Sequence, residues 1–220
     1  ECLQRWNQGD NKILELSKAY KLELGSGWNI PAGILHAPGS LCTYEPQWAS
    51  DISAMFQSLV NNVPFGWGSL VSYVPDEYKN DLDYIIDLID WLANEDPSFK
   101  KNHQLLPKPA KSNANVAGMV DHWIVYGADL FASKETTILP GSTVVMKDPG
   151  AYSLITIQGS GTLGVHRVES PALIRFGELT QDEFFVSHKA AVEGVTVTNP
   201  SSTDPIVFLK TFGPGIPNDI

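Results

Sequence analysis

The feature that most constrains this fold is a run of short apolar segments in the second half of the chain. The segments that read as strands are 122–126, 136–139, 142–147, 152–158, 162–167, 172–176, 183–186, 195–198 and 206–211. Turns rich in glycine separate them, among them Pro140-Gly141 and Gly159-Ser160-Gly161. Short strands at even spacing, with no long helix between them, predict an antiparallel barrel or jelly roll.

The first half of the chain also contains a strand pattern, centred on residues 27–51. Residues 18–24 alternate between apolar and polar positions, and residues 52–59 form a further apolar run, so both flanking segments are predicted as strands. A proline and a glycine within residues 31–33 predict a tight turn. His36 therefore enters an extended segment just after a turn, where a ligand or a base can be held rigidly.

Between these two regions the apolar residues change to helical spacing. A helix is predicted after Pro75, and Pro97 ends it. The apolar residues at that spacing are Leu82, Ile85, Ile86, Ile89 and Leu92. Lysine, proline, asparagine and serine then dominate residues 100–115, which read as an exposed linker that contains a domain boundary.

The segment P-A-G-I-L-H at residues 31–36 resembles the second signature of the cupin superfamily, a proline and glycine turn followed by a metal-ligand histidine. The continuation to residue 51 resembles the corresponding segment of mannose-6-phosphate isomerases, in which a histidine, a small turn and E-x-Q-x-x-S-D recur. Those positions are His36, Gly39, Glu45, Gln47, Ser50 and Asp51. This resemblance covers about a tenth of the chain.

The sequence departs from that family at two places. In the family a short run after S-D ends in a catalytic arginine, but residues 52–55 read Ile-Ser-Ala-Met. No H-x-H or comparable pair precedes His36, although the family's first signature should supply further metal ligands there. Because the chain begins with Glu1, we infer a processed, proteolysed or truncated product.

The resemblance implies an all-β fold with a minor helical insertion, built from two cupin-type double-stranded β-helix barrels, the first truncated at its N-terminus. Residues 1–62 would be the C-terminal part of the first barrel, residues 63–115 a loop, helix and linker, and residues 116–220 a second barrel. The second barrel is predicted to be degenerate. Where a metal-binding cupin has its histidine pair, it reads Ala151, Tyr152 and Ser153.

The resemblance also assigns roles to residues of the first barrel. His36 would hold a divalent metal, zinc or another transition ion, which suits imidazole and carboxylate ligands. Glu45 would be the catalytic acid or base, and Gln47, two residues along the same strand face, would bind a sugar hydroxyl. Trp28 would stack on the substrate, as would Tyr44 or Trp48, although aromatic residues at barrel positions are more often core.

The other histidines have no mutual metal spacing and read as structural. They are His103, His122, His166 and His188. Of these, His188 lies roughly where a ligand of the second barrel would fall.

Three functions stay open on these grounds. The first is a metal-dependent sugar or sugar-phosphate isomerase that interconverts an aldose and a ketose. The second is a non-catalytic cupin that binds a carbohydrate or another small polar ligand. A cupin dioxygenase using iron is a third, because a fold alone does not fix the chemistry.

The composition of the chain limits the classes of binding partner and the cellular compartment that we expect for it. A net charge of −10 argues against a nucleic-acid binder and weakens a membrane-surface role. No apolar run is long enough to span a bilayer, and the two cysteines, Cys2 and Cys42, are too few for a disulfide framework. We therefore expect a cytoplasmic protein with reduced thiols, whose partner is a small sugar or sugar phosphate. The resemblance adds an expected homodimer.

Overall fold

The computed structural model describes residues 1–50, 52–170, 176–216 and 219–220. The chain divides into two compact units. The first unit comprises Glu1–Leu24, Trp28–Tyr44 and Ala49–Gln104. The second unit comprises Gly25–Gly27, Glu45–Trp48 and Leu105–Ile220. Each is described separately below.

Short elements separated by irregular chain make up the N-terminal part of the protein. In order they are η1 (Leu3–Gln8), η2 (Ile13–Leu16), β1 (Gly27–Trp28), β2 (Leu59–Val60), β3 (Val63–Pro64), α1 (Gly68–Val71), η3 (Asp76–Tyr78), α2 (Leu82–Asp87), α3 (Trp91–Asn94), α4 (Phe99–His103) and β4 (Gln104–Leu105). A small core of the first unit gathers Trp6, Leu70, Val71, Val74 and Ile85. The indole Nε1 of Trp6 donates to the Phe65 carbonyl oxygen at 2.9 Å, which ties η1 to this core.

The predicted long helix is divided into separate short helices. The Asp81 side chain accepts hydrogen bonds from the backbone N–H groups of Asp83 and Tyr84 and so begins α2. A second N-cap, Asp90, accepts from the Ala93 N–H and begins α3. Aspartate at an N-cap has extended backbone and starts a new helix, so the apolar periodicity continues across a break in the backbone.

The strand predicted at 18–24 is not formed, and of the strand predicted at 52–59 only Leu59 lies in a strand, the two-residue β2. Residues 1–50 and 52–104 contain only two-residue strands. Apolar alternation needs a partner strand to become a sheet. Here the alternating Tyr20 packs on aromatic rings instead, with its ring centroid 5.0 Å from that of Trp28 and 6.2 Å from that of Phe99. A first cupin barrel is therefore not found in this part of the described chain.

The second unit contains the longer strands, and the prediction of a mostly β fold is confirmed there. Its elements are β5 (Lys108–Pro109), η4 (Lys111–Asn113), β6 (Met119–Val125), β7 (Ala132–Ile138), β8 (Thr143–Met146), β9 (Tyr152–Gln158), β10 (Ser160–Leu163), β11 (His166–Glu169), β12 (Glu183–Val186), α5 (His188–Glu193), β13 (Val195–Thr198) and β14 (Ile206–Phe212). The strand predicted at 172–176 lies, apart from its last residue, outside the described residues.

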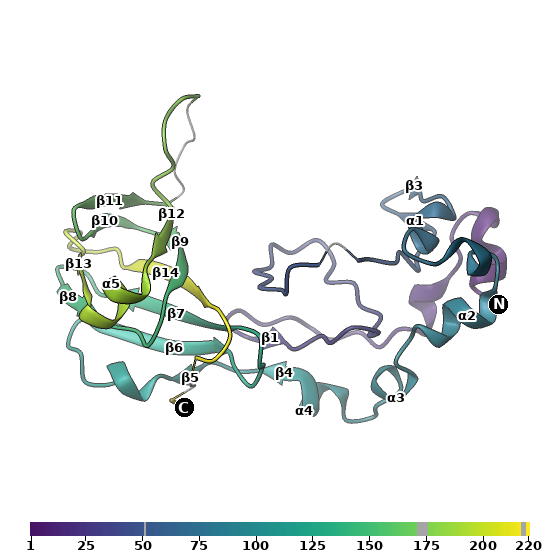
Figure 1. The fold of residues 1–220 in the computed structure, drawn as a ribbon, viewed down its shortest axis with the longest axis horizontal. Helices are drawn as coiled ribbons and strands as arrows, with labels where there is room; N and C mark the ends of the chain where they lie inside the picture. The colour runs from purple at the N-terminus through teal and green to yellow at the C-terminus, as the bar shows by residue number, and fades with distance from the viewer. Residues whose placement is uncertain (51, 171–175, 217–218) are drawn as a thin grey trace. The chain divides into compact units, whose positions relative to one another are not determined.

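Two antiparallel sheets form this unit, seen in Figure 1. One has the strand order β12-β9-β14-β7-β6-β5 and the other the order β11-β10-β13-β8. From β7 to β14 the chain crosses repeatedly between the sheets, and β14 returns to pair with β7. This strand order is that of an eight-stranded jelly roll, with β5 and β6 added to one sheet.

The core of the second unit lies between the two sheets. Strands β6 and β9 alternate buried and more exposed positions, as expected when one face of a sheet is covered. The larger sheet contributes Trp123, Ile138, Tyr152, Leu154, Phe208 and Phe212, and the smaller sheet contributes Val144, Met146, Leu163, Val168 and Val197.

The segment predicted as a linker, residues 100–115, contains short elements. Its backbone is held by hydrogen bonds, because the Ala110 N–H donates to the Asp121 carbonyl oxygen and the Lys111 N–H to that of Asp219. Among the helices of the described chain, none has both the length and the apolar character needed to cross a membrane.

Candidate functional site

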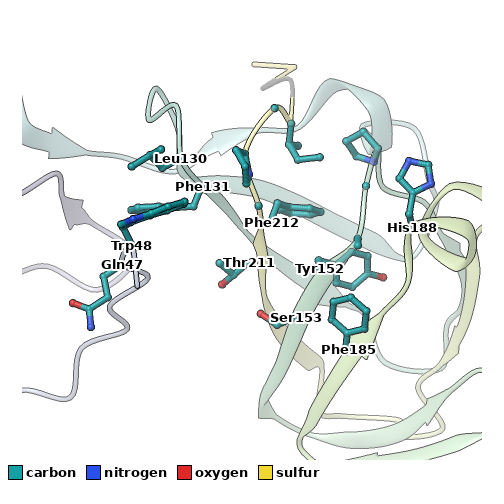
Figure 2. Close-up of a pocket in the computed structure, with 17 residues that line it drawn as sticks. Gln47, Trp48, Leu130, Phe131, Tyr152, Ser153, Phe185, His188, Thr211 and Phe212 are labelled. Carbon is teal, nitrogen blue, oxygen red and sulfur yellow. The ribbon is translucent and has the colours of Figure 1, made fainter. Parts of the chain in front are cut away.

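A pocket of about 710 Å³ lies at one end of the six-stranded sheet of the second unit (Figure 2). Its aromatic lining consists of Trp48, Phe131, Tyr152, Phe185 and Phe212. Its polar side chains are Gln47, Ser153, His188 and Thr211. Concave sites of this size, with aromatic walls and a few polar groups, are typical of small-molecule binding.

The strand register explains why these side chains meet. Phe185 of β12 is paired with Ser153 of β9, and Ser153 is paired with Thr211 of β14. Paired residues of antiparallel strands point to the same face, so the three side chains form a row across the sheet. Their sequence neighbours, Tyr152 and Phe212, stand at the ends of β9 and β14, where they border the pocket while their rings pack into the core, with ring centroids 5.4 Å apart.

Exposed aromatic rings stand beside this row. The Trp48 side chain is 55% exposed and Phe185 is 76% exposed, although both are large and apolar. In the view of Figure 2, Thr211 and Ser153 lie between the rings of Trp48 and Phe185. Aromatic rings and hydroxyl-bearing side chains thus line the same open pocket.

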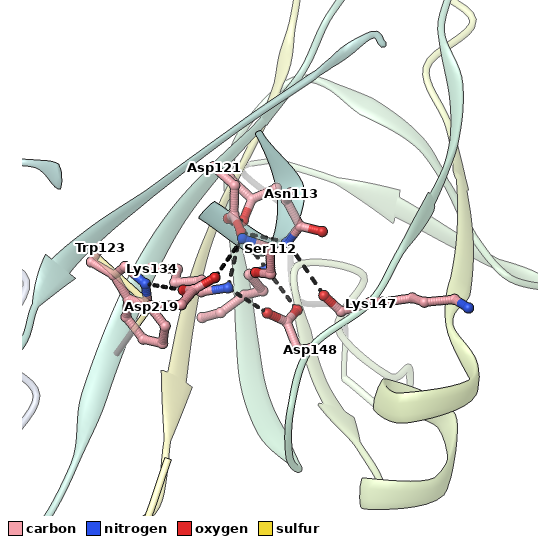
Figure 3. Close-up of polar contacts among 10 residues, drawn as sticks. Ser112, Asn113, Asp121, Trp123, Lys134, Lys147, Asp148 and Asp219 are labelled. Atoms are coloured by element: carbon pink, nitrogen blue, oxygen red, sulfur yellow. Dashed lines mark hydrogen bonds and ion pairs between the residues drawn. The ribbon is translucent and has the colours of Figure 1, made fainter. Parts of the chain in front are cut away.

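The interior of the same jelly roll contains a buried network of four charged side chains (Figure 3). Lys134 Nζ lies 2.9 Å from Asp148 Oδ1 and 3.0 Å from Asp121 Oδ2. Lys210 Nζ lies 2.7 Å from Asp148 Oδ2 and 3.5 Å from Asp121 Oδ1. All four side chains are fully buried, so each ammonium is neutralised by carboxylates inside the protein.

Further contacts complete the network. The Thr136 hydroxyl and the Asn113 amide both donate to Asp121, the amide at 2.7 Å. The ammonium of Lys134 lies 4.5 Å from the centre of the Trp123 ring, a cation–π contact. The indole of Trp123 in turn donates to Asp219 Oδ1 at 2.7 Å.

The network holds Asp121 and Lys134 in their charged forms. Burial alone raises the pKa of Asp121, but the charges of Lys210 and Lys134 and the hydrogen bond from Thr136 outweigh it and lower this pKa below its ordinary value. Burial likewise lowers the pKa of Lys134, but the charges of Asp148 and Asp121 outweigh it and raise this pKa. Lys134 is therefore not available as a neutral nucleophile near pH 7.

Tyr152 connects the network to the pocket. Its side chain is 1% exposed, it lines the pocket, and Lys210 Nζ lies 5.5 Å from the centre of its ring. Its buried hydroxyl has no hydrogen-bond partner among the described residues. Burial, reinforced by the charges of Asp148 and Asp121, raises the pKa of Tyr152, so the phenol stays neutral.

Sequence reasoning did not identify this network, although one signal was present. Lys210 is in phase with Ile206 and Phe208 in β14, so its side chain shares their buried face. A lysine at an inward position of an otherwise apolar strand indicates a buried charge with a partner. Its partners come from distant strands and loops, and no local pattern names them.

A resident metal does not fit the interior of this jelly roll. Both carboxylates are already engaged by ammonium groups, and two fixed positive charges would repel a divalent cation. Throughout the described part of the chain, no group of three or more histidine, cysteine, aspartate or glutamate side chains could hold a metal ion.

The four residues predicted as one site fall in different units. His36 and Trp28 belong to the first unit, whereas Glu45 and Gln47 belong to the second. His36 is exposed, and its Nδ1 lies 2.9 Å from the Ile34 carbonyl oxygen. Because a carbonyl oxygen only accepts, Nδ1 is the donor in this contact, which leaves Nε2 as the ring nitrogen that would bind a metal.

The predicted substrate-binding residues have separate surroundings. Trp28 packs within an aromatic group of the first unit, with its ring stacked on that of Phe99 at 6.0 Å. Gln47 lines the pocket of the second unit. Glu45 is exposed. Asp51, the last residue of the matched segment, lies outside the described residues. The roles given to these side chains stay predictions.

Comparison with known proteins gave no matching family model and no matching curated protein. Solved structures similar to this chain include the polyketide cyclase RemF from Streptomyces resistomycificus, at 13% identity over 52% of this chain and 80% of that chain, with a TM-score of 0.35. A cupin-2 domain from Rhodospirillum rubrum aligns at 13% identity over 51% and 70%, with a TM-score of 0.34.

Oxalate decarboxylase from Lactobacillus farciminis aligns at 21% identity over 53% of this chain and 33% of that chain, with a TM-score of 0.35. An RmlC-like cupin protein from Ralstonia eutropha is a further similar structure, at 10% identity over 49% and 64%, with a TM-score of 0.33. These structures include cupins. Because all these TM-scores are low, the fold assignment rests on the strand order described above.

Proposed function

We propose that the second unit is a cupin-type jelly roll that binds a carbohydrate or another small polar ligand without catalysing a reaction. The observation that supports this function best is the cross-strand pair of Ser153 and Thr211 beside the exposed rings of Trp48 and Phe185. The proposal concerns the pocket of the second unit alone.

The chemistry of a sugar matches this arrangement. The C–H groups on one face of a pyranose ring pack on an aromatic ring, while its hydroxyl groups both donate and accept hydrogen bonds. Hydroxyl and amide side chains, such as those of Ser153 and Gln47, also do both. A ligand that is apolar on its faces and polar at its edges can therefore use the whole pocket.

The buried network gives this pocket a rigid base. Lys210 and Thr211 are consecutive in β14, so the ion pairs of Lys210 fix the strand that carries the Thr211 hydroxyl. Preorganised polar groups lose less entropy when a ligand binds. Because both lysine side chains are buried in contact with the same two carboxylates, the network supports the site.

Binding can be tested by titrating the protein with neutral mono- and disaccharides while following backbone amide shifts by NMR. We expect saturable shifts at Ser153, Thr211 and the residues around Trp48. Trp48→Ala should lose the response, whereas Trp91→Ala, which removes a 45% exposed tryptophan of the first unit, should keep it. Absence of any shift with the whole saccharide panel would contradict the proposal.

The sugar or sugar-phosphate isomerase stays a prediction from the sequence. It requires a metal at His36 and proton transfer by Glu45, residues that belong to different units. Its test is elemental analysis of the purified chain and of His36→Ala, followed by an isomerase assay on phosphorylated hexoses. Stoichiometric metal that is lost in the variant would favour the isomerase over the binding function.

A further inference from the structure

We infer that the pocket of the second unit selects uncharged polyhydroxy ligands and discriminates against their phosphorylated or carboxylated forms. The inference rests on the proposed function and adds the charge of the ligand. It separates neutral sugars from the sugar phosphates that the sequence resemblance suggests.

The first observation is the composition of the pocket wall. None of the described residues that line it is an aspartate, glutamate, lysine or arginine. His188 is the one imidazole among these described lining residues, and it is exposed. Proteins that recognise phosphate or carboxylate groups use arginine, lysine or converging backbone N–H groups. The described part of this wall therefore offers a ligand no lysine or arginine charge.

The second observation is that the nearby buried cations are already neutralised. Lys134 and Lys210 both contact Asp121 and Asp148, so two positive charges face two negative charges. All four side chains are 0% exposed. An anion in the pocket could recruit an ammonium only by breaking a buried ion pair, which leaves a carboxylate uncompensated. Asp219, which accepts from Trp123, adds a further negative charge near Lys134.

The third observation is the charge of the whole chain. Its net charge of −10 repels anions at distances where the charges are not screened by salt. Local and long-range electrostatics therefore act in the same direction. A phosphate or carboxylate placed in this pocket would lose hydration without gaining a charged partner, whereas the hydroxyl groups of a neutral sugar can exchange water for Ser153, Thr211 and Gln47.

Matched ligands test the inference. The protein is titrated by NMR at pH 7.5 with a neutral hexose or disaccharide from the panel above, with its 6-phosphate and with its uronate. We expect the neutral ligand to bind at least about tenfold more tightly than either anion, since an unpaired desolvated charge is costly. Raising the salt concentration should narrow that difference by screening the long-range repulsion.

A charge variant makes the test specific to the pocket. Ser153→Lys places an ammonium in the pocket wall and should improve binding of the phosphate relative to the neutral sugar. Thr196→Lys makes the same change of net charge at an exposed position of β13, in the other sheet, and should leave the preference unchanged. Equal or tighter binding of the anions by the unmodified protein would overturn this inference alone. If no neutral or anionic sugar binds, the proposed function fails and the inference with it.

Discussion

Lys210 Nζ lies 2.7 Å from Asp148 Oδ2 inside the jelly roll, and both side chains are fully buried. Each residue also contacts a member of a second pair, because Asp148 accepts from Lys134 and Lys210 faces Asp121. The four charges thus form a closed group in which removing one member leaves an excess of the opposite sign. The stability of the protein should therefore depend on each of the four charges.

Asp148→Ala is expected to lower the free energy of unfolding by about 3 to 5 kcal/mol, because two buried ammonium groups would then share one carboxylate. Urea unfolding followed by circular dichroism measures the loss. Glu169→Ala is the matched control. It breaks the ion pair with Arg167, in which the two side chains are 65% and 43% exposed, and should cost less than about 1 kcal/mol. Equal losses in the two variants would show that burial of the network does not matter.

The network also predicts how stability depends on pH at the acid end. The pKa of Asp121 is lower in the folded protein than its ordinary value of 3.8, so its contribution is present above about pH 3.8. That contribution is lost as the pH falls through the lowered pKa. Urea unfolding between pH 6 and pH 2 measures this loss. In Asp121→Asn the dependence on pH should be shallower, and an unchanged slope would contradict the assignment.

At alkaline pH the stability of the protein changes in the opposite direction and falls as the pH rises. The pKa of Lys134 is raised above 10.5 and that of Tyr152 above 10.0, so both groups keep their protons in the folded protein after the unfolded chain has lost them. Stability is therefore full below about pH 10 and falls as the pH rises further. Tyr152→Phe should reduce this alkaline loss, which the same unfolding measurements at pH 9 to 11 detect. An equal loss of stability between pH 9 and pH 11 in the variant and the unmodified protein would contradict a raised pKa of the buried phenol.

Gly159, in the turn between β9 and β10, is expected to be intolerant of substitution. Its φ is +81°, and an added Cβ would collide with the Pro205 carbonyl oxygen. Gly141 also has a positive φ, +70°, but no atom of the described chain lies within 4 Å of its Cβ position. Gly141→Ala should cost about 1 kcal/mol for the backbone conformation alone. Gly159→Ala should cost clearly more, because backbone atoms must move apart; comparable losses in thermal unfolding would contradict this contact.

Variants of Trp48 and Trp28 distinguish ligand binding in the pocket from ligand binding at the site predicted from the sequence. Trp48→Ala should weaken binding of a neutral saccharide at least about tenfold, because it removes one aromatic wall. Trp28→Ala should leave the affinity unchanged and destabilise the first unit, where its ring packs on Tyr20 and Phe99. Calorimetric titration together with thermal unfolding of both variants distinguishes the two effects. Loss of affinity in Trp28→Ala would favour the original placement of the ligand.

The sequence alone determined most of the strands of the second unit. Apolar alternation and glycine turns are local signals, and in segments such as β9 and β14 they agree with packing against a second sheet. The same alternation at residues 18–24 did not produce a strand, because Tyr20 packs on aromatic rings and no partner strand is present there in the described chain. A strand pattern becomes a strand only where a neighbouring strand takes up its hydrogen bonds.

The tertiary structure decided the chemistry of the candidate site. Ser153, Thr211 and Phe185 are far apart in sequence, and the register of three strands brings them to one face. Lys134 and Lys210 meet the same two aspartates only because the strand β7 pairs with β14. Periodicity shows which side of a strand is buried, but long-range pairing sets which buried charges meet. The physical reason is that an ion pair depends on distances of a few ångströms, which local sequence does not fix.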